Sequence, residues 1–197
     1  KQHKILKRQS FDRIEQLKDQ VLLVRLNTAQ NSISALQKAN KIEQAEYVRR
    51  KVQEENETLI SGFRKHFTFT KIYFFYSDDA ERLRNHQFDQ VKLFDAEKQP
   101  LDNPAILQNG YLVAAVGMVY HDQYVQQSQG VRHAVAGTNG MPALVLMDTD
   151  YVNLRKPFPY RVILDANKGV EEISVRNLDH QLYKYFSRSQ RKKWRSG

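Results

Sequence analysis

Compact apolar segments alternate with longer segments of helical periodicity along this chain of 197 residues. Five of the compact segments predict buried strands, because each is rich in β-branched or other apolar residues and is bounded by turn-forming residues. They are residues 21–26, 71–76, 111–119, 143–147 and 160–164. Residues 91–95 predict a further, shorter strand.

Apolar residues spaced three or four positions apart predict helices between these strands. The longest pattern runs from Ile33 to Phe67, with a polar interruption at Asn56 and a kink or short loop at Ala39–Asn40. A second copy of the chain could pair with this long helix to form a homodimer, but a stripe broken in this way more often covers a sheet. Shorter helices are predicted over residues 10–19, 80–85 and 175–186.

This alternation predicts an α/β fold, with a mixed, partly parallel sheet covered by helices and a long N-terminal helical segment. We expect residues 1–197 to form a single domain, since the length suits one core. Residues 1–19 are expected to form an arm or a short helix, and residues 187–197 a basic C-terminal tail. Residues 121–140 lack periodicity, and a loop of about 20 residues is usually functional.

The net charge of +9 is concentrated at the two ends of the chain. Residues 1–10 carry four bases and no acid, and residues 184–197 carry six bases and no acid. The other 173 residues hold 21 bases against 22 acids, so the body is close to neutral. Basic ends are more often solubilising tails than nucleic-acid-binding faces. Weak binding of nucleic acid through the basic tail is therefore an alternative rather than the leading interpretation.

Several classes of chemistry are excluded by composition and motifs. The chain has no cysteine, so it has no disulfide framework, thiol nucleophile or dithiol redox centre. Its longest apolar run, Tyr111–Tyr120, has ten residues where a membrane span needs about 20. It contains no glycine-rich phosphate loop and no serine-hydrolase motif. His121 and His133 could ligate a metal, but their spacing is unspecific. We therefore expect no cofactor.

Acidic residues follow two of the predicted strands. Asp78 and Asp79 come after residues 71–76, and Asp148 comes after residues 143–147. Carboxylates beyond strand ends can bind Mg²⁺ or transfer protons, which suggests a metal-dependent hydrolase as one alternative. Aspartate is also common in turns and helix caps, and this structural interpretation is favoured.

Residues 140–148, Gly-Met-Pro-Ala-Leu-Val-Leu-Met-Asp, resemble the thioredoxin-fold signature in which a cis-proline precedes an apolar strand. The resemblance implies a cis bond at Met141–Pro142. It also implies that Pro142 lies against the turn at residues 77–79, where that fold carries its cysteine pair. The expected groove contains Ser77, Asp78, Asp79, Met141 and Pro142, with residues 121–140, including His133, as its lid. Without cysteines such a groove would bind an extended peptide along Met141 rather than exchange disulfides.

Residues 73–77, 143–148 and 155–160 resemble an uncharacterised bacterial family of single-domain proteins. The family implies no activity, but its members begin with an export signal, which favours the periplasm or the exterior. The first residue, Lys1, is compatible with removal of such a segment. The leading interpretation is a non-catalytic binding or interaction domain with an unknown protein or peptide partner.

Overall fold

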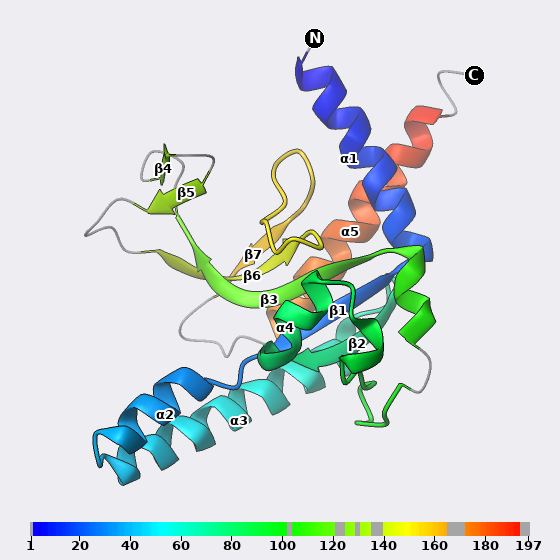
Figure 1. Ribbon diagram of the computed structural model, residues 1–197. Helices are drawn as coiled ribbons and strands as arrows, with labels where there is room; N and C mark the ends of the chain where they lie inside the picture. Colours follow the sequence, from blue (N-terminus) through cyan, green and yellow to red (C-terminus); the bar gives the residue numbers. More distant parts are fainter. Residues whose placement is uncertain are drawn as a thin grey trace.

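A five-stranded mixed sheet forms the centre of the computed structural model (Figure 1). The structure describes residues 2–101, 104–120, 125–128, 131–134, 140–164 and 172–193. The strand order is β2-β1-β3-β6-β7. These strands are β1 (Val21–Leu26), β2 (Lys71–Tyr76), β3 (Tyr111–Val119), β6 (Met141–Met147) and β7 (Arg161–Ile163). β1 is parallel to both of its neighbours, whereas β6 is antiparallel to β3 and β7. The predicted α/β fold with a mixed, partly parallel sheet is confirmed.

Helices pack on both faces of the sheet. The α-helices are α1 (Gln2–Asp19), α2 (Gln30–Lys38), α3 (Ile42–His66), α4 (Ala80–Arg84) and α5 (Glu172–Lys193). Three short 3-10 helices are η1 (Ser77–Asp79), η2 (Phe88–Gln90) and η3 (Pro104–Asn109). The helix break expected at Ala39–Asn40 separates α2 from α3, and Asn40 adopts a positive φ of 57°. Asparagine tolerates this left-handed conformation better than most residues.

Two apolar cores share the sheet, because successive side chains of a strand point to opposite faces. Leu22, Val24 and Leu26 of β1 pack with buried residues of α1, α3 and α5. Leu23 faces the other side, where Leu83 of α4 is buried with it. The three long helices therefore cover one face, and α4 with the short 3-10 helices covers the other.

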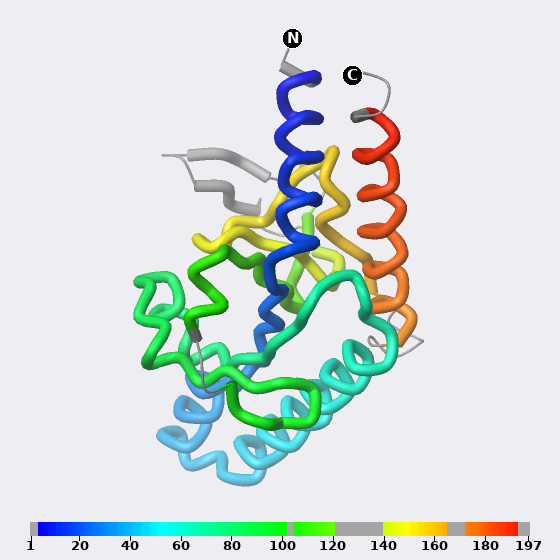
Figure 2. The backbone as a smooth tube through the Cα atoms, turned by 90° about the vertical axis from the view of Figure 1, so that its right-hand side faces the viewer, coloured from blue at the N-terminus to red at the C-terminus, as the bar shows by residue number. Residues whose placement is uncertain are grey.

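Helix α2 and the first half of α3 form an arm that projects from the sheet (Figures 1 and 2). In the arm, Ile33 of α2 and Ala45 of α3 are buried. In the second half of α3, Leu59 and Phe63 belong instead to the core on the sheet. The apolar stripe suggested for pairing with a second copy is thus covered partly by α2 and partly by the sheet of the same chain.

The predictions for two segments, a strand at residues 91–95 and a loop at residues 121–140, differ from the structure. Residues 91–95 form no strand; only Phe94 forms isolated bridges, to Phe74 and Pro100. The chain turns immediately afterwards, because Asp95 Oδ1 accepts hydrogen bonds from the N–H groups of Glu97 (2.9 Å) and Gln99 (2.8 Å). Residues 121–140 were expected to be a loop. They include an antiparallel pair of strands, β4 (Val125–Ser128) and β5 (Val131–Ala134).

The expected basic tail is mostly helical. α5 continues to Lys193, so the prediction of a tail is wrong for residues 187–193, and residues 194–197 lie outside the described part. α1 likewise begins at Gln2 instead of near residue 10. Mutual packing explains both extensions, since Phe11 contacts Tyr185 with ring centroids 5.1 Å apart and Gln190 Nε2 donates to Glu15 Oε1 (3.2 Å).

Candidate functional site

A cavity of about 430 Å³ lies at the carboxyl ends of β1 and β2, against β3. In the sheet, β1 lies between β2 and β3. The chain passes from β1 to β2 on one side and then returns to β3 on the other side, so the strand order reverses between β1 and β3. Such a switch point is where open α/β sheets bind ligands. The cavity, here called the crevice, is lined by Arg25, Asn27, Glu55, Asn56, Leu59, Ser77, Val116, Pro142 and Leu164. Its lining combines apolar with polar side chains.

Asn56 of α3 holds the end of β1 in place. Its Oδ1 accepts from the N–H of Asn27 (3.1 Å), and its Nδ2 donates to the carbonyl of Asn27 (2.7 Å). Asn27 Oδ1 in turn accepts from the N–H of Ala29 (2.9 Å), which has a positive φ of 49°. The polar interruption in the helical pattern was the signal for this role, because an amide on the inner side of a helix needs polar partners.

Ser77 belongs to a chain of hydrogen bonds whose direction can be assigned. Thr28 Oγ1 donates to Asp78 Oδ1 (2.6 Å). Since Thr28 has one hydroxyl proton, Ser77 Oγ must be the donor in the 3.0 Å contact between the two hydroxyls. Ser77 Oγ also accepts from the N–H of Thr28 (3.2 Å). The Ser77 hydroxyl is therefore engaged in holding the loop.

Arg25 lines the crevice from the end of β1, and its guanidinium packs against Tyr151 on the side of the sheet that α4 covers. It is partly buried, and among the described residues no carboxylate lies within ion-pair distance of its guanidinium. The guanidinium lies 5.7 Å from the ring centre of Tyr151, and that of Arg84 lies 5.1 Å from the same ring. Burial raises the pKa of Tyr151 to about 12, and Tyr111 adds to the rise, while the two arginines oppose it.

The structure brings together only part of the expected groove. Ser77 and Pro142, 65 positions apart in sequence, line the same crevice. Asp78 is exposed and accepts from Thr28, whereas Asp79 is buried, pairs with Arg82 and accepts from the N–H of Lys92 (3.2 Å). His133 stands in β5 opposite Gln126, and its side chain lies outside the described part.

The cis bond that the resemblance implies at Met141–Pro142 is absent. The bond is trans, and the cis peptide in the described part of the chain is Lys156–Pro157. Pro142 lies within β6 in register with Met118, and a proline near the start of a strand is tolerated there with ordinary geometry. Met141 also offers no free peptide-binding edge, because it pairs with Val119 on one side and the carbonyl of Pro142 accepts from Leu164 N–H (2.9 Å) on the other.

Asp148 does not join Asp78 and Asp79. β6 runs antiparallel to β3, so the end of β6 lies level with Val113, toward the amino ends of β1 and β3. Asp148 Oδ1 accepts from the N–H groups of Asp150 (3.1 Å) and Val152 (2.9 Å), which is the bonding of a turn. Among the residues that the structure describes, no group of three or more acidic or histidine side chains is placed to hold a metal ion. The three acids proposed for a hydrolase thus form no common site.

Comparisons with protein-family models, curated proteins and solved structures found no match for this chain. In the described part, no helix is long and apolar enough to cross a membrane.

Proposed function

We propose that the protein is a non-catalytic binding domain and that its ligand site is the crevice. The ligand is a peptide or protein segment that presents a carboxylate beside an apolar side chain. Arg25 carries this proposal, because a partly buried guanidinium without a carboxylate partner among the described residues favours an anionic ligand. Val116, Pro142 and Leu164 supply the apolar contacts.

The other charged residue of the crevice does not neutralise Arg25. Glu55 is exposed and lies 3.9 Å from Lys51 on the same helix. The hydroxyl of Ser77 is committed to Thr28, which supports binding over catalysis. Binding specificity would then come from the distance between Arg25 and the apolar residues of the crevice. In many ligand sites a few polar groups orient a largely apolar ligand in this way.

A titration followed by ¹H–¹⁵N NMR tests this proposal with two small probes. N-acetyl-leucine carries a carboxylate beside an apolar side chain, and N-acetyl-leucinamide lacks only the charge. We expect the acid to shift the amide signals of Asn27, Val116 and Leu164 and to bind about tenfold more tightly than the amide, because a charged hydrogen bond contributes about 1.5–3 kcal/mol.

The Arg25→Met variant should lose this tenfold preference. Arg50→Met is the matched control, since Arg50 is an exposed arginine of α3 away from the crevice, and it should bind like the wild type. Equal affinity for the acid and the amide, or an unchanged preference in Arg25→Met, would show that the crevice does not recognise carboxylates.

A further inference from the structure

The two basic ends of the chain meet at one end of the folded molecule. The first half of α1 and the last half of α5 extend beyond the sheet side by side (Figures 1 and 2). Phe11 packs on Tyr185, and Phe158 packs on Tyr185 from the connection before β7 (6.1 Å between ring centroids). Residues 2–11, 152–163 and 180–193 therefore form one surface, here called the basic end.

The basic end carries no acidic residue. Its three segments contribute three, three and five lysines and arginines, eleven in all, without an aspartate or glutamate. Lys7 and Lys192 both place their ammonium groups near the ring of Phe11, at 5.7 and 5.5 Å. In the described structure, Lys156, Arg161 and Arg188 lie outside ion-pair distance of any carboxylate. Like charges held this close attract a polyanion.

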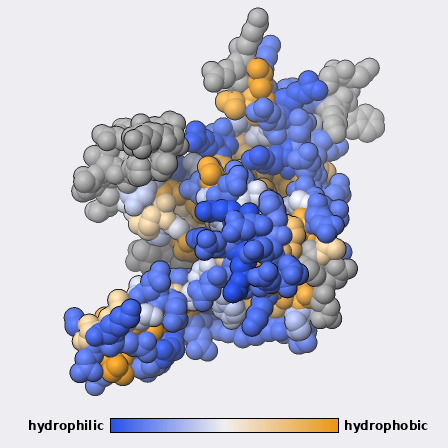
Figure 3. Space-filling model, in the orientation of Figure 1, coloured by the Kyte–Doolittle hydropathy of each residue, from blue (hydrophilic) through white to orange (hydrophobic). Residues whose placement is uncertain are grey.

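Exposed apolar side chains lie among these charges. Ile5 and Leu6 of α1 are 57% and 45% exposed, and Val152 is 52% exposed. Leu6 and Val152 line the same cavity of about 490 Å³, and Asp148 lines it as well. Figure 3 shows apolar atoms on the projecting part of α1 next to hydrophilic ones. Nucleic-acid phosphates would use the charges but leave these side chains in water. The interface of an anionic bilayer would use both.

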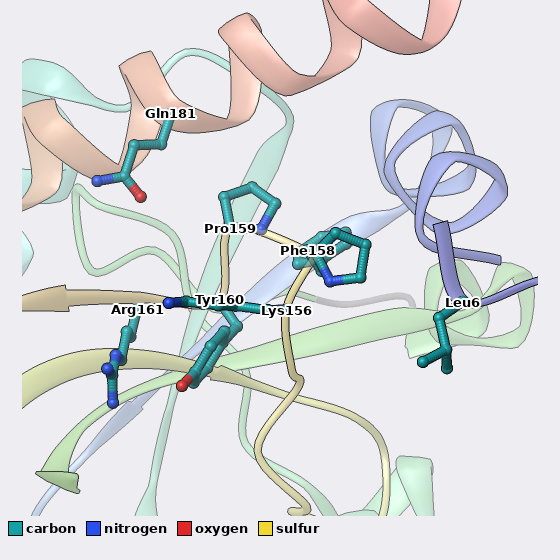
Figure 4. A pocket seen from close by; sticks show the side chains of 8 residues that line it. Leu6, Lys156, Phe158, Pro159, Tyr160, Arg161 and Gln181 are labelled. Atoms are coloured by element: carbon teal, nitrogen blue, oxygen red, sulfur yellow. The ribbon is translucent and has the colours of Figure 1, made fainter. Parts of the chain in front are cut away.

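A second cavity, of about 540 Å³, offers a place for an anionic group beside Leu6. Figure 4 shows Leu6 on one side of it and Tyr160 with Arg161 on the other, with Gln181 of α5 above them. Lys156 also lines this cavity, so two cations and an amide surround it, and no carboxylate does. This is the donor set expected for a phosphate group.

We propose that the basic end docks the protein on anionic lipid bilayers. Ile5 and Leu6 enter the interfacial region, and the cavity between Lys156 and Arg161 takes a lipid headgroup phosphate. The surrounding lysines and arginines add long-range attraction to the negative surface. This membrane contact is independent of the crevice, which lies at the carboxyl ends of β1 and β2 on the other side of the body.

Sedimentation with lipid vesicles tests the proposal. The full chain should bind vesicles of equal parts phosphatidylcholine and phosphatidylglycerol and should not bind vesicles of phosphatidylcholine alone. The double variant Lys156→Glu/Arg161→Glu should lose at least about thirtyfold in affinity, because each cation near an anionic surface contributes about 1 kcal/mol, or about fivefold. Lys38→Glu/Lys41→Glu makes the same change of charge on the arm and should lose much less.

A second variant separates a membrane from other polyanions. Ile5→Ser/Leu6→Ser keeps every charge and should lose about tenfold in affinity for the mixed vesicles, since it removes apolar burial at the interface. Wild-type vesicle affinity in this variant, or equally tight binding of the wild type to single-stranded RNA at the same ionic strength, would overturn the proposal. Arg25→Met should bind vesicles like the wild type. Unchanged circular dichroism melting of each variant shows that folding is not the cause of the losses.

Discussion

Asn56 lies where a single side chain joins α3 to the end of β1. Both of its hydrogen bonds go to the backbone of Asn27. The Asn56→Ala variant should lower the free energy of unfolding by about 1–2 kcal/mol, because two hydrogen bonds at the crevice are lost. Urea denaturation measures this. Gln53→Ala, an exposed control on the same helix, should stay within about 0.5 kcal/mol. Equal effects of the two substitutions would contradict the role of Asn56.

Removal of the hydroxyl group from each of two neighbouring tyrosines, Tyr111 and Tyr151, should change the free energy of unfolding differently. The hydroxyl of Tyr151 is buried and has no hydrogen-bond partner among the residues that the structure describes, whereas that of Tyr111 donates to the carbonyl of Leu83 (3.3 Å). Tyr151→Phe should therefore leave the free energy of unfolding unchanged or raise it, because it removes a buried polar group that gains nothing. Tyr111→Phe should lower it by about 1 kcal/mol. Denaturation at neutral pH measures both, and a larger loss in Tyr151→Phe would show that its hydroxyl has a role.

The same pair predicts how stability depends on pH. Burial raises the pKa of both tyrosines to about 12, and Asp150 adds to the rise at Tyr111. An unfolded tyrosine has a pKa of about 10, so the folded state prefers the neutral phenol. The stability that this preference gives to the folded state is fully present below pH 10 and is lost as the pH rises through 12. Ultraviolet titration of tyrosinate should show one late-ionising group fewer in Tyr151→Phe than in the native protein.

Only some of the residues that line the crevice could be predicted from the sequence. Ser77 and Pro142 follow from the resemblance of residues 140–148 to a known signature, and both line the crevice although the cis bond that it implied is absent. Arg25 was not predicted, because it looks like the solvent-facing residue of an otherwise apolar strand. Leu164 was not predicted either, because its place in the crevice depends on how β7 pairs with β6.

Among the elements, strands with strong local signals were predicted well, and so was the partly parallel start of the sheet, but the direction of β6 was not. The limits of β1, β2 and β3 match the apolar runs in the sequence, because each run is bounded by turn residues. Nothing in residues 141–147 shows that β6 runs antiparallel to β3, and this direction is what separates Asp148 from Asp78. The end of α5 was misjudged for a similar reason. Lysines and arginines suggested a tail, while the contacts that keep it helical come from α1, more than 170 positions away.

Packing between α1 and α5 predicts the effect of shortening the chain. Deletion of residues 187–197 removes buried Ser189 and the hydrogen bond from Gln190 to Glu15. We expect the amides of α1 to exchange with deuterium at least about tenfold faster in this variant, because α1 loses part of the surface on which it packs. Deletion of residues 194–197 alone is the control and should leave α1 protected. Unchanged exchange of α1 after the longer deletion would mean that the last turns of α5 do not support it.

The molecule as a whole has a cooperative body and an arm with little burial of its own. The two cores lie on opposite faces of one sheet, so loss of either exposes the strands that hold the other. The arm, by contrast, has few buried side chains, among them Ile33 of α2 and Ala45 of α3. Its distance from the sheet suggests that it opens without the rest of the molecule.

Hydrogen exchange of the whole chain tests this separation. Amides of residues 30–50 should exchange at least about tenfold faster than those of residues 59–66. The first group exchanges through local opening of the arm, whereas the second exchanges only when the body unfolds. Ile33→Ser should accelerate exchange in residues 30–50 and leave residues 59–66 unchanged, since its side chain is buried only in the arm. Gln37→Ser, an exposed control on α2, should change neither group by much. If Ile33→Ser accelerated both groups equally, the arm and the body would unfold as one unit, and α2 would be part of the cooperative core.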